Sequence, residues 1–143
     1  MSQENVEIVR RIYELFAGDW TAGDSSEATM SEFVDPDIHI DMTRRVINPA
    51  SYHGYEGVRR VRDEVREVWD EWSTFPERLI DAGDSVVVIE TQRGRGASSG
   101  LEVAGDRWAS IWKLRDGRVT LFSGYHPIEE ALEAAGLGEE PPG

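Results

Sequence analysis

The spacing of apolar residues along the chain changes from a helical period to a strand period near Phe75-Pro76. Before this point, the clearest helix is predicted over 56–72, and its apolar residues recur every three or four positions. After it, apolar and polar residues alternate, which predicts strands over 77–82, 85–95, 101–115 and 118–125. Helices followed by an antiparallel meander indicate an α+β fold, with helices laid on one curved sheet.

The remaining segments complete this architecture. Apolar spacing predicts a first helix over 2–17 and a short second helix that ends near Phe33. A strand is expected over 37–42, a loop over 43–55, and a last helix from Pro127 to Gly136. Asp116-Gly117 is a strong signal for a tight hairpin between the last two strands.

Composition excludes several classes of function. The 143 residues suit one domain, and 28 acidic against 15 basic residues give a formal net charge of −13. Such a chain repels phosphate backbones, so no nucleic-acid partner is expected. Without cysteine there are no disulfides or thiolate sites. No long apolar run predicts a membrane span, and the acidic N-terminus is unlike a secretory signal, so a cytoplasmic location is expected.

Several short motifs together carry a resemblance to a known family. They occur in order along nearly the whole chain, at 6–19, 33–37, 55–59, 81–88, 112–119 and 130–137. In this order they resemble the SnoaL-like proteins of the nuclear transport factor 2-like superfamily. The resemblance implies one cone-shaped α+β barrel over 1–137, with 138–143 expected to be a disordered tail. It also implies a homodimer formed through the outer face of the sheet.

The family contains polyketide cyclases, ketosteroid isomerases, epoxide hydrolases, scytalone dehydratases and proteins with no known reaction. The resemblance therefore implies a small apolar or aromatic ligand and cofactor-free chemistry, but it does not select a reaction. Two positions depart from the ketosteroid isomerases, because Ile12 and Ser110 stand where those enzymes carry hydrogen-bond donors to the enolate.

Asp41 is the first catalytic candidate. Strand alternation places Asp37, His39 and Asp41 on one face and Ile38 and Ile40 on the other. Either the polar face lines the interior, or the isoleucines do and the charges meet solvent. The resemblance places Asp41 at the position of the isomerase base, where a dry pocket would raise its pKa.

His126, at the end of the last strand, is the second candidate, as a partner acid near neutral pH or as a cap of the barrel mouth. The three histidines lack the spacing of metal ligands, so no metal is expected.

Large aromatic residues and a few polar ones could form a ligand site. Trp108, Ser110 and Trp112 share one strand face, and indoles on such a face are core or pocket walls. Glu90 lies among valines, which indicates either a pocket residue or a dimer interface. The full set of predicted ligand-binding residues is Tyr13, His39, Trp72, Glu90, Trp108, Ser110, Trp112 and Phe122.

These residues suggest a pocket that binds a small, mostly apolar molecule. If the protein is an enzyme, the expected reaction is proton transfer in a cyclisation, isomerisation or dehydration, with Asp41 as base and His126 as acid. The alternatives are a binding protein without catalysis and a dimeric interaction module.

Overall fold

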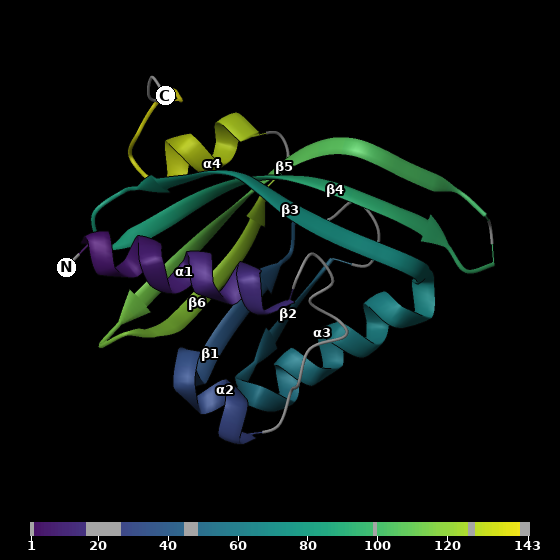
Figure 1. Cartoon of the computed structure of the whole chain (residues 1–143), viewed down its shortest axis with the longest axis horizontal. Helices are drawn as coiled ribbons and strands as arrows, with labels where there is room; N and C mark the ends of the chain where they lie inside the picture. The colour runs from purple at the N-terminus through teal and green to yellow at the C-terminus, as the bar shows by residue number, and fades with distance from the viewer. Residues whose placement is uncertain (1, 17–26, 45–48, 99, 126–127, 141–143) are drawn as a thin grey trace.

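The computed structural model describes residues 2–16, 27–44, 49–98, 100–125 and 128–140, and Figure 1 shows their arrangement. The elements follow the predicted order of helices first and a meander second, with a short helix at the end. They are α1 Ser2–Phe16, α2 Glu27–Phe33, β1 Val34–Met42, β2 Ala50–His53, α3 Gly54–Val68, β3 Trp69–Asp81, β4 Ser85–Gly96, β5 Glu102–Arg115, β6 Arg118–Tyr125 and α4 Ile128–Ala134.

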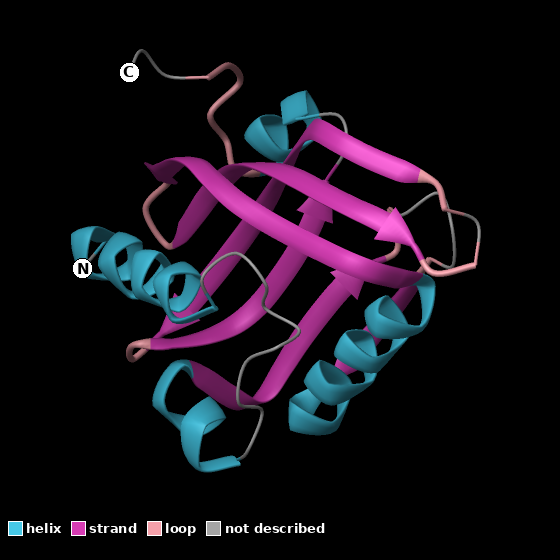
Figure 2. Ribbon diagram, turned by 45° about the vertical axis from the view of Figure 1, so that its right-hand side comes forward, coloured by secondary structure: helices cyan, strands magenta, loops and turns pink. Residues whose placement is uncertain are grey.

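The six strands form one sheet in the order β2-β1-β6-β5-β4-β3. Neighbouring strands are antiparallel except β1 and β6, which run parallel. Figure 2 shows the sheet as a twisted, curved surface with helices packed around it. The predicted α+β cone is thus confirmed as an unclosed curved sheet.

Strand β4 is buried on both faces of the sheet. Val86 and Val88 pack with Val6 and Val9 of α1. Their neighbour Val87 packs on the other side with α4. We call the face toward α1 the inner face and the face toward α4 the outer face. Two-sided burial explains why the run from Val86 to Glu90 is buried at every position.

The orientation of β1 settles which of its faces lies inside. Ile38 and Ile40 are buried in a cluster with Ile12 of α1 and Val61 of α3. The polar residues between them therefore lie on the outer face, as the second of the two predicted arrangements has it. His39 stacks there on His53 of β2, with ring centroids 4.6 Å apart.

The helix predicted over 56–72 is shorter than expected, and this boundary is a correction. Helix α3 ends at Val68, and the extended backbone of Trp69 begins β3. Trp69 and Trp72 fit a helical spacing and also favour strands. Pairing with β4 decides between the two, since Trp69 lies opposite Gly96 and Trp72 opposite Gly94.

A second correction concerns residues 43–55, which were expected to form a loop. In the structure this segment contains strand β2. Its four residues pair antiparallel with the end of β1. Only one of them, Tyr52, is buried, so the local sequence carries no alternating pattern. Its packing partner is helix α3, where a Cβ at Gly57 would approach the Tyr52 Cβ to 2.9 Å.

The hairpin predicted at Asp116-Gly117 is confirmed. Both residues have positive φ, 53° and 79°, which is the backbone of a type I′ turn between twisted strands. This turn pairs Leu114 with Val119, and a register shift between Lys113 and Leu114 then places Trp112 opposite Phe122.

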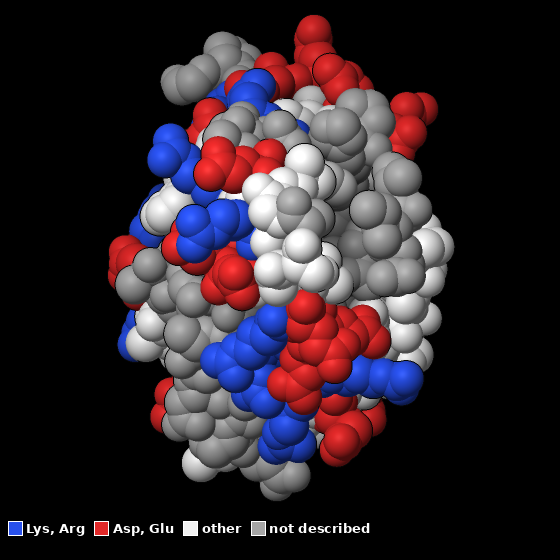
Figure 3. Space-filling view, turned by 90° about the vertical axis from the view of Figure 1, so that its right-hand side faces the viewer, with Lys and Arg blue, Asp and Glu red and all other residues white. Residues whose placement is uncertain are grey.

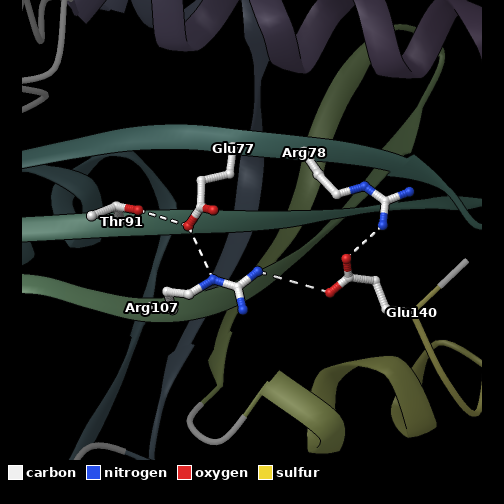
Figure 4. A network of polar contacts seen from close by, with 5 residues as sticks. All are labelled: Glu77, Arg78, Thr91, Arg107 and Glu140. Atoms are coloured by element: carbon white, nitrogen blue, oxygen red, sulfur yellow. Dashed lines mark hydrogen bonds and ion pairs between the residues drawn. The ribbon is translucent and has the colours of Figure 1, made fainter. Parts of the chain in front are cut away.

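The residues after α4 contact the outer face of the sheet through charges. Figure 4 shows the Glu140 carboxylate between the guanidinium groups of Arg78 and Arg107, at 2.6 Å and 3.8 Å. Arg107 also pairs with Glu77, which accepts a hydrogen bond from Thr91. Part of the tail expected to be disordered, up to Glu140, thus lies against β3 and β5, and 141–143 lie outside the described residues.

On the face in Figure 3 the acidic side chains do not form one continuous patch, because basic side chains lie between them. On α3, Arg60 pairs with Glu64 at 3.8 Å, one helical turn away. Such exposed pairs contribute only a few tenths of a kcal/mol each. Among the described helices, none is long and apolar enough to cross a membrane.

The Trp72–Gly94 pair predicts that Gly94→Ala is destabilising. A Cβ at Gly94 would come within 2.5 Å of the Trp72 ring and 2.9 Å of a backbone oxygen of Glu71. We expect a loss of about 1–3 kcal/mol in the free energy of unfolding, measured by urea denaturation. Gly124→Ala is the matched control, because its Cβ would meet only Met42 side-chain atoms at 3.4–3.5 Å. Equal stability of both variants would contradict this packing.

Candidate functional site

Glu90 is a buried carboxyl group on the inner face of β4. It follows Val86 and Val88 on that face and is only 4% exposed. The sheet supplies neighbours on both sides, with Trp108 of β5 and Pro76 of β3 directly opposite in register. A charged group in such a place needs hydrogen bonds or a counter-charge.

Tyr13 of α1 reaches this carboxyl group from above the sheet. Its hydroxyl donates a hydrogen bond of 2.8 Å to Glu90 Oε2. Tyr13 lies one helical turn beyond Val9, which packs on Val86 and Val88. The apolar stripe of α1 therefore holds the tyrosine over Glu90.

Ser110 and Trp112 of β5 extend the polar group. The Trp112 Nε1–H donates to Ser110 Oγ at 2.9 Å, and Ser110 Oγ lies 3.5 Å from the Tyr13 hydroxyl. The Trp112 ring also contacts Tyr13 at 5.6 Å and Phe122 edge-on at 4.8 Å between centroids. We call Tyr13, Glu90, Ser110 and Trp112 the inner-face cluster.

Burial gives Glu90 an unusual proton affinity. Loss of hydration raises its pKa from 4.5 to about 7, although hydrogen bonds with Tyr13 and Ser110 oppose this shift. Burial and the adjacent Glu90 charge raise the pKa of Tyr13 well above its usual value, so the phenol stays protonated. A carboxyl group that titrates near neutral pH can both accept and give a proton.

Asp41 lies apart from this cluster, on the outer face. It accepts hydrogen bonds from the backbone and hydroxyl of Thr43 at 3.0 and 2.6 Å, and it pairs with Arg44 at 2.9 Å. Partial burial alone would raise its pKa, but these hydrogen bonds and the Arg44 charge lower it. The expected upward shift is therefore wrong, because polar partners replace the dry pocket.

The other predicted residues are spread over the molecule. His39 is on the outer face, Trp72 lies farther along β3 beside Gly94, and His126 lies outside the described residues. Phe122 and Trp108 share the inner face with the cluster by register. Residues of the cluster were each foreseen singly, but the contact of Tyr13 with Glu90 was not.

Two hollows stand out between described residues, and neither is lined by the inner-face cluster. One, of about 150 Å³, lies on the outer face beside α4, between Lys113 and Tyr125. The other lies along the exposed side of α1. Within the described parts of the chain, no three His, Asp or Glu side chains converge in a way that could hold a metal ion.

Comparisons with known proteins agree on the fold. Residues 9–122 match the model of the SnoaL-like domain family. No curated protein sequence matches the chain.

Three solved structures illustrate the similarity. A protein from Jannaschia sp. CCS1, proposed to be a SnoaL-like polyketide cyclase, has 20% identity and a TM-score of 0.70 over 97% of this chain and 94% of its own. TerC, co-crystallised with polyporic acid, has 20% identity and a TM-score of 0.69 over 93% and 98%. A protein from Catenulispora acidiphila with a ketosteroid isomerase-like fold, in complex with trimethylamine, has 18% identity and a TM-score of 0.66 over 92% of this chain and 97% of its own.

The raised pKa of Glu90 predicts how stability depends on pH. The folded chain holds a proton on Glu90 that the unfolded chain releases above pH 4.5. This contribution to stability is present at low pH and is lost as the pH rises through about 7. Its upper limit is about 3 kcal/mol.

We therefore expect Glu90→Gln to lose less unfolding free energy than the wild type between pH 5 and pH 8. Urea denaturation of both proteins at the two pH values measures these losses. Groups that the substitution leaves unchanged, such as Asp41, contribute equally to both proteins and so cancel in the comparison. Parallel pH profiles would show that Glu90 titrates normally.

Proposed function

Because the chain belongs to the SnoaL-like domain family of the nuclear transport factor 2-like fold, we propose that it binds a small, mostly apolar molecule at the inner-face cluster and exchanges a proton with it. The observation that carries this proposal is the buried Glu90 carboxyl group hydrogen-bonded to Tyr13. Glu90 takes the role of acid and base for which Asp41 and His126 were predicted.

Aromatic rings around the cluster support an apolar ligand. On the inner face the Trp112 ring contacts both Tyr13 and Phe122, and Trp108 lies opposite Glu90. Flat rings of this kind provide large apolar contact area, while a few polar groups orient the ligand.

Proton transfer at Glu90 needs no cofactor. The ionised carboxylate removes a proton from an acidic C–H, N–H or O–H group of the ligand and so becomes neutral. The same carboxylic acid then returns the proton to another atom of the ligand, which completes an isomerisation or cyclisation. Tyr13 stabilises the ionised form through its hydrogen bond, and exclusion of water keeps the proton affinity high.

Two similar structures hold small molecules, trimethylamine in one and polyporic acid in the other. They support a small-molecule ligand here without identifying it.

A homodimer through the outer face is the second part of the proposal. Tyr125 lies on that face beneath the guanidinium group of Arg44, 4.2 Å from the ring centroid, and the hollow beside α4 adjoins it. The hollow, lined in part by Lys113, Leu121 and Ser123, could accept a side chain of a second copy in the cytoplasm. Light scattering in solution tests this part independently of ligand binding.

Deuterium exchange into a ketone tests proton transfer directly. The wild type is expected to accelerate exchange of the α-protons of 2-tetralone in D2O, followed by NMR. Glu90→Gln should reduce the acceleration by about 100-fold or more, since it removes the acid/base group and keeps the shape. Asp41→Asn is the matched control and should leave the rate within about twofold.

Other outcomes separate the alternatives. Loss of exchange in Asp41→Asn alone would restore the first candidate base and overturn the role of Glu90. Quenching of tryptophan fluorescence by 2-tetralone without any exchange would favour a binding protein that does not catalyse proton transfer.

A further inference from the structure

The inner-face cluster also indicates what the polar end of its ligand is. We propose that the ligand carries a protonated amine, which binds the carboxylate of Glu90. This inference rests on the binding site proposed above and narrows its ligand to organic cations with an apolar scaffold.

Hydrogen-bond directions in the cluster all lead to Glu90. Trp112 N–H donates to Ser110, and Tyr13 O–H donates to Glu90. Ser110 Oγ lies 3.5 Å from the Tyr13 hydroxyl, and Ser110 also forms a hydrogen bond with the Glu90 carboxyl group that lowers its pKa. The hydrogen bonds of Tyr13 and Ser110 thus converge on Glu90, and the cluster ends on an acceptor.

The cluster therefore has acceptor capacity left and few donors. Tyr13 and Ser110 supply two hydrogen bonds to the Glu90 carboxyl group, whose two oxygens can accept about four. A ligand carbonyl or carboxylate would find the N–H and O–H groups already engaged. A ligand with N–H donors would complete the coordination of the carboxylate.

Charge favours a cationic donor over a neutral one. In the part of the chain that the structure describes, burial, Tyr13 and Ser110 are the influences on the proton affinity of Glu90, and no lysine, arginine or histidine is among them. A buried carboxylate without a counter-charge is costly. An ammonium group supplies that charge together with charge-assisted hydrogen bonds.

Aromatic rings beside Glu90 suit the same ligand. Tyr13 and Trp112 lie in contact, and Trp108 lies across from Glu90 on β5. The faces of such rings attract organic cations. The net charge of −13 adds a long-range attraction for cations and repels anions.

A pair of probes that differ mainly in charge tests the inference. Benzylammonium and benzyl alcohol have the same ring and nearly the same shape, and their binding can be followed by tryptophan fluorescence and NMR at pH 8. We expect the wild type to bind benzylammonium about tenfold to a hundredfold more tightly than benzyl alcohol. Glu90→Gln should remove this preference, so that the two probes bind with about equal affinity.

Two controls isolate the role of Glu90. Glu133→Gln removes one exposed acidic charge from α4 and should keep the preference, which separates local from overall charge. The pH dependence gives a second readout, because only ionised Glu90 binds the cation. Affinity for benzylammonium should rise about tenfold per pH unit up to about pH 7 and then level off, while benzyl alcohol shows no such slope.

Tyr13→Phe provides a further check that does not alter Glu90 itself. It removes the donor to Oε2, so the pH midpoint of benzylammonium binding should move upward.

The outcomes distinguish this inference from the proposed function. Equal affinity of the wild type for both probes, with no effect of Glu90→Gln, would overturn the amine assignment and leave the small-molecule site standing. Absence of binding by either probe would also overturn it, while the ketone exchange experiment decides the proposed function separately. If Glu133→Gln abolished the preference for the cation, the preference would be due to the overall charge of the protein and not to Glu90.

Discussion

Burial of β4 on both faces is the constraint on which the rest of the structure depends. The backbone of a central strand is satisfied by its neighbours, but the side chains from Val86 to Ile89 need apolar cover above and below. Helix α1 supplies this cover on the inner face and α4 on the outer face. The same cover excludes water from Glu90, at the end of the run, and so gives this carboxyl group its high proton affinity. Core packing and candidate chemistry thus have one origin.

Much of the fold could be predicted from the sequence because it depends on short-range patterns. The continuous apolar run of β4, the alternation in β5 and β6 and the Asp116-Gly117 turn identify the meander without knowledge of distant contacts. The boundary between α3 and β3 could not be predicted in this way. Trp69 and Trp72 satisfy both periods, and their pairing with glycines of β4, far along the chain, decides the outcome. Strand β2 was missed for a similar reason, since it is specified by β1 and α3 rather than by its own four residues.

The site illustrates the same limit. The sequence shows that Glu90 lies among valines and that two tryptophans share one strand face. Tyr13, however, is 77 positions from Glu90 along the chain, and nothing local predicts their contact. The properties of Asp41, in contrast, were available locally. Thr43 and Arg44 lie two and three positions after it, and a short side chain that binds the backbone two residues later is a common turn motif. Reading that motif would have predicted a lowered pKa.

The parallel pairing of β1 with β6 has a consequence for how the chain becomes folded. His39 pairs with Leu121, so one long side of β1 stays without its hydrogen-bonding partner until the last strand has left the ribosome. The β3–β5 meander, whose strands are neighbours in sequence, can assemble earlier. Closing the sheet is then a late event that joins the two ends of the chain. During synthesis the exposed edge of β1 is where pairing with other nascent chains would begin.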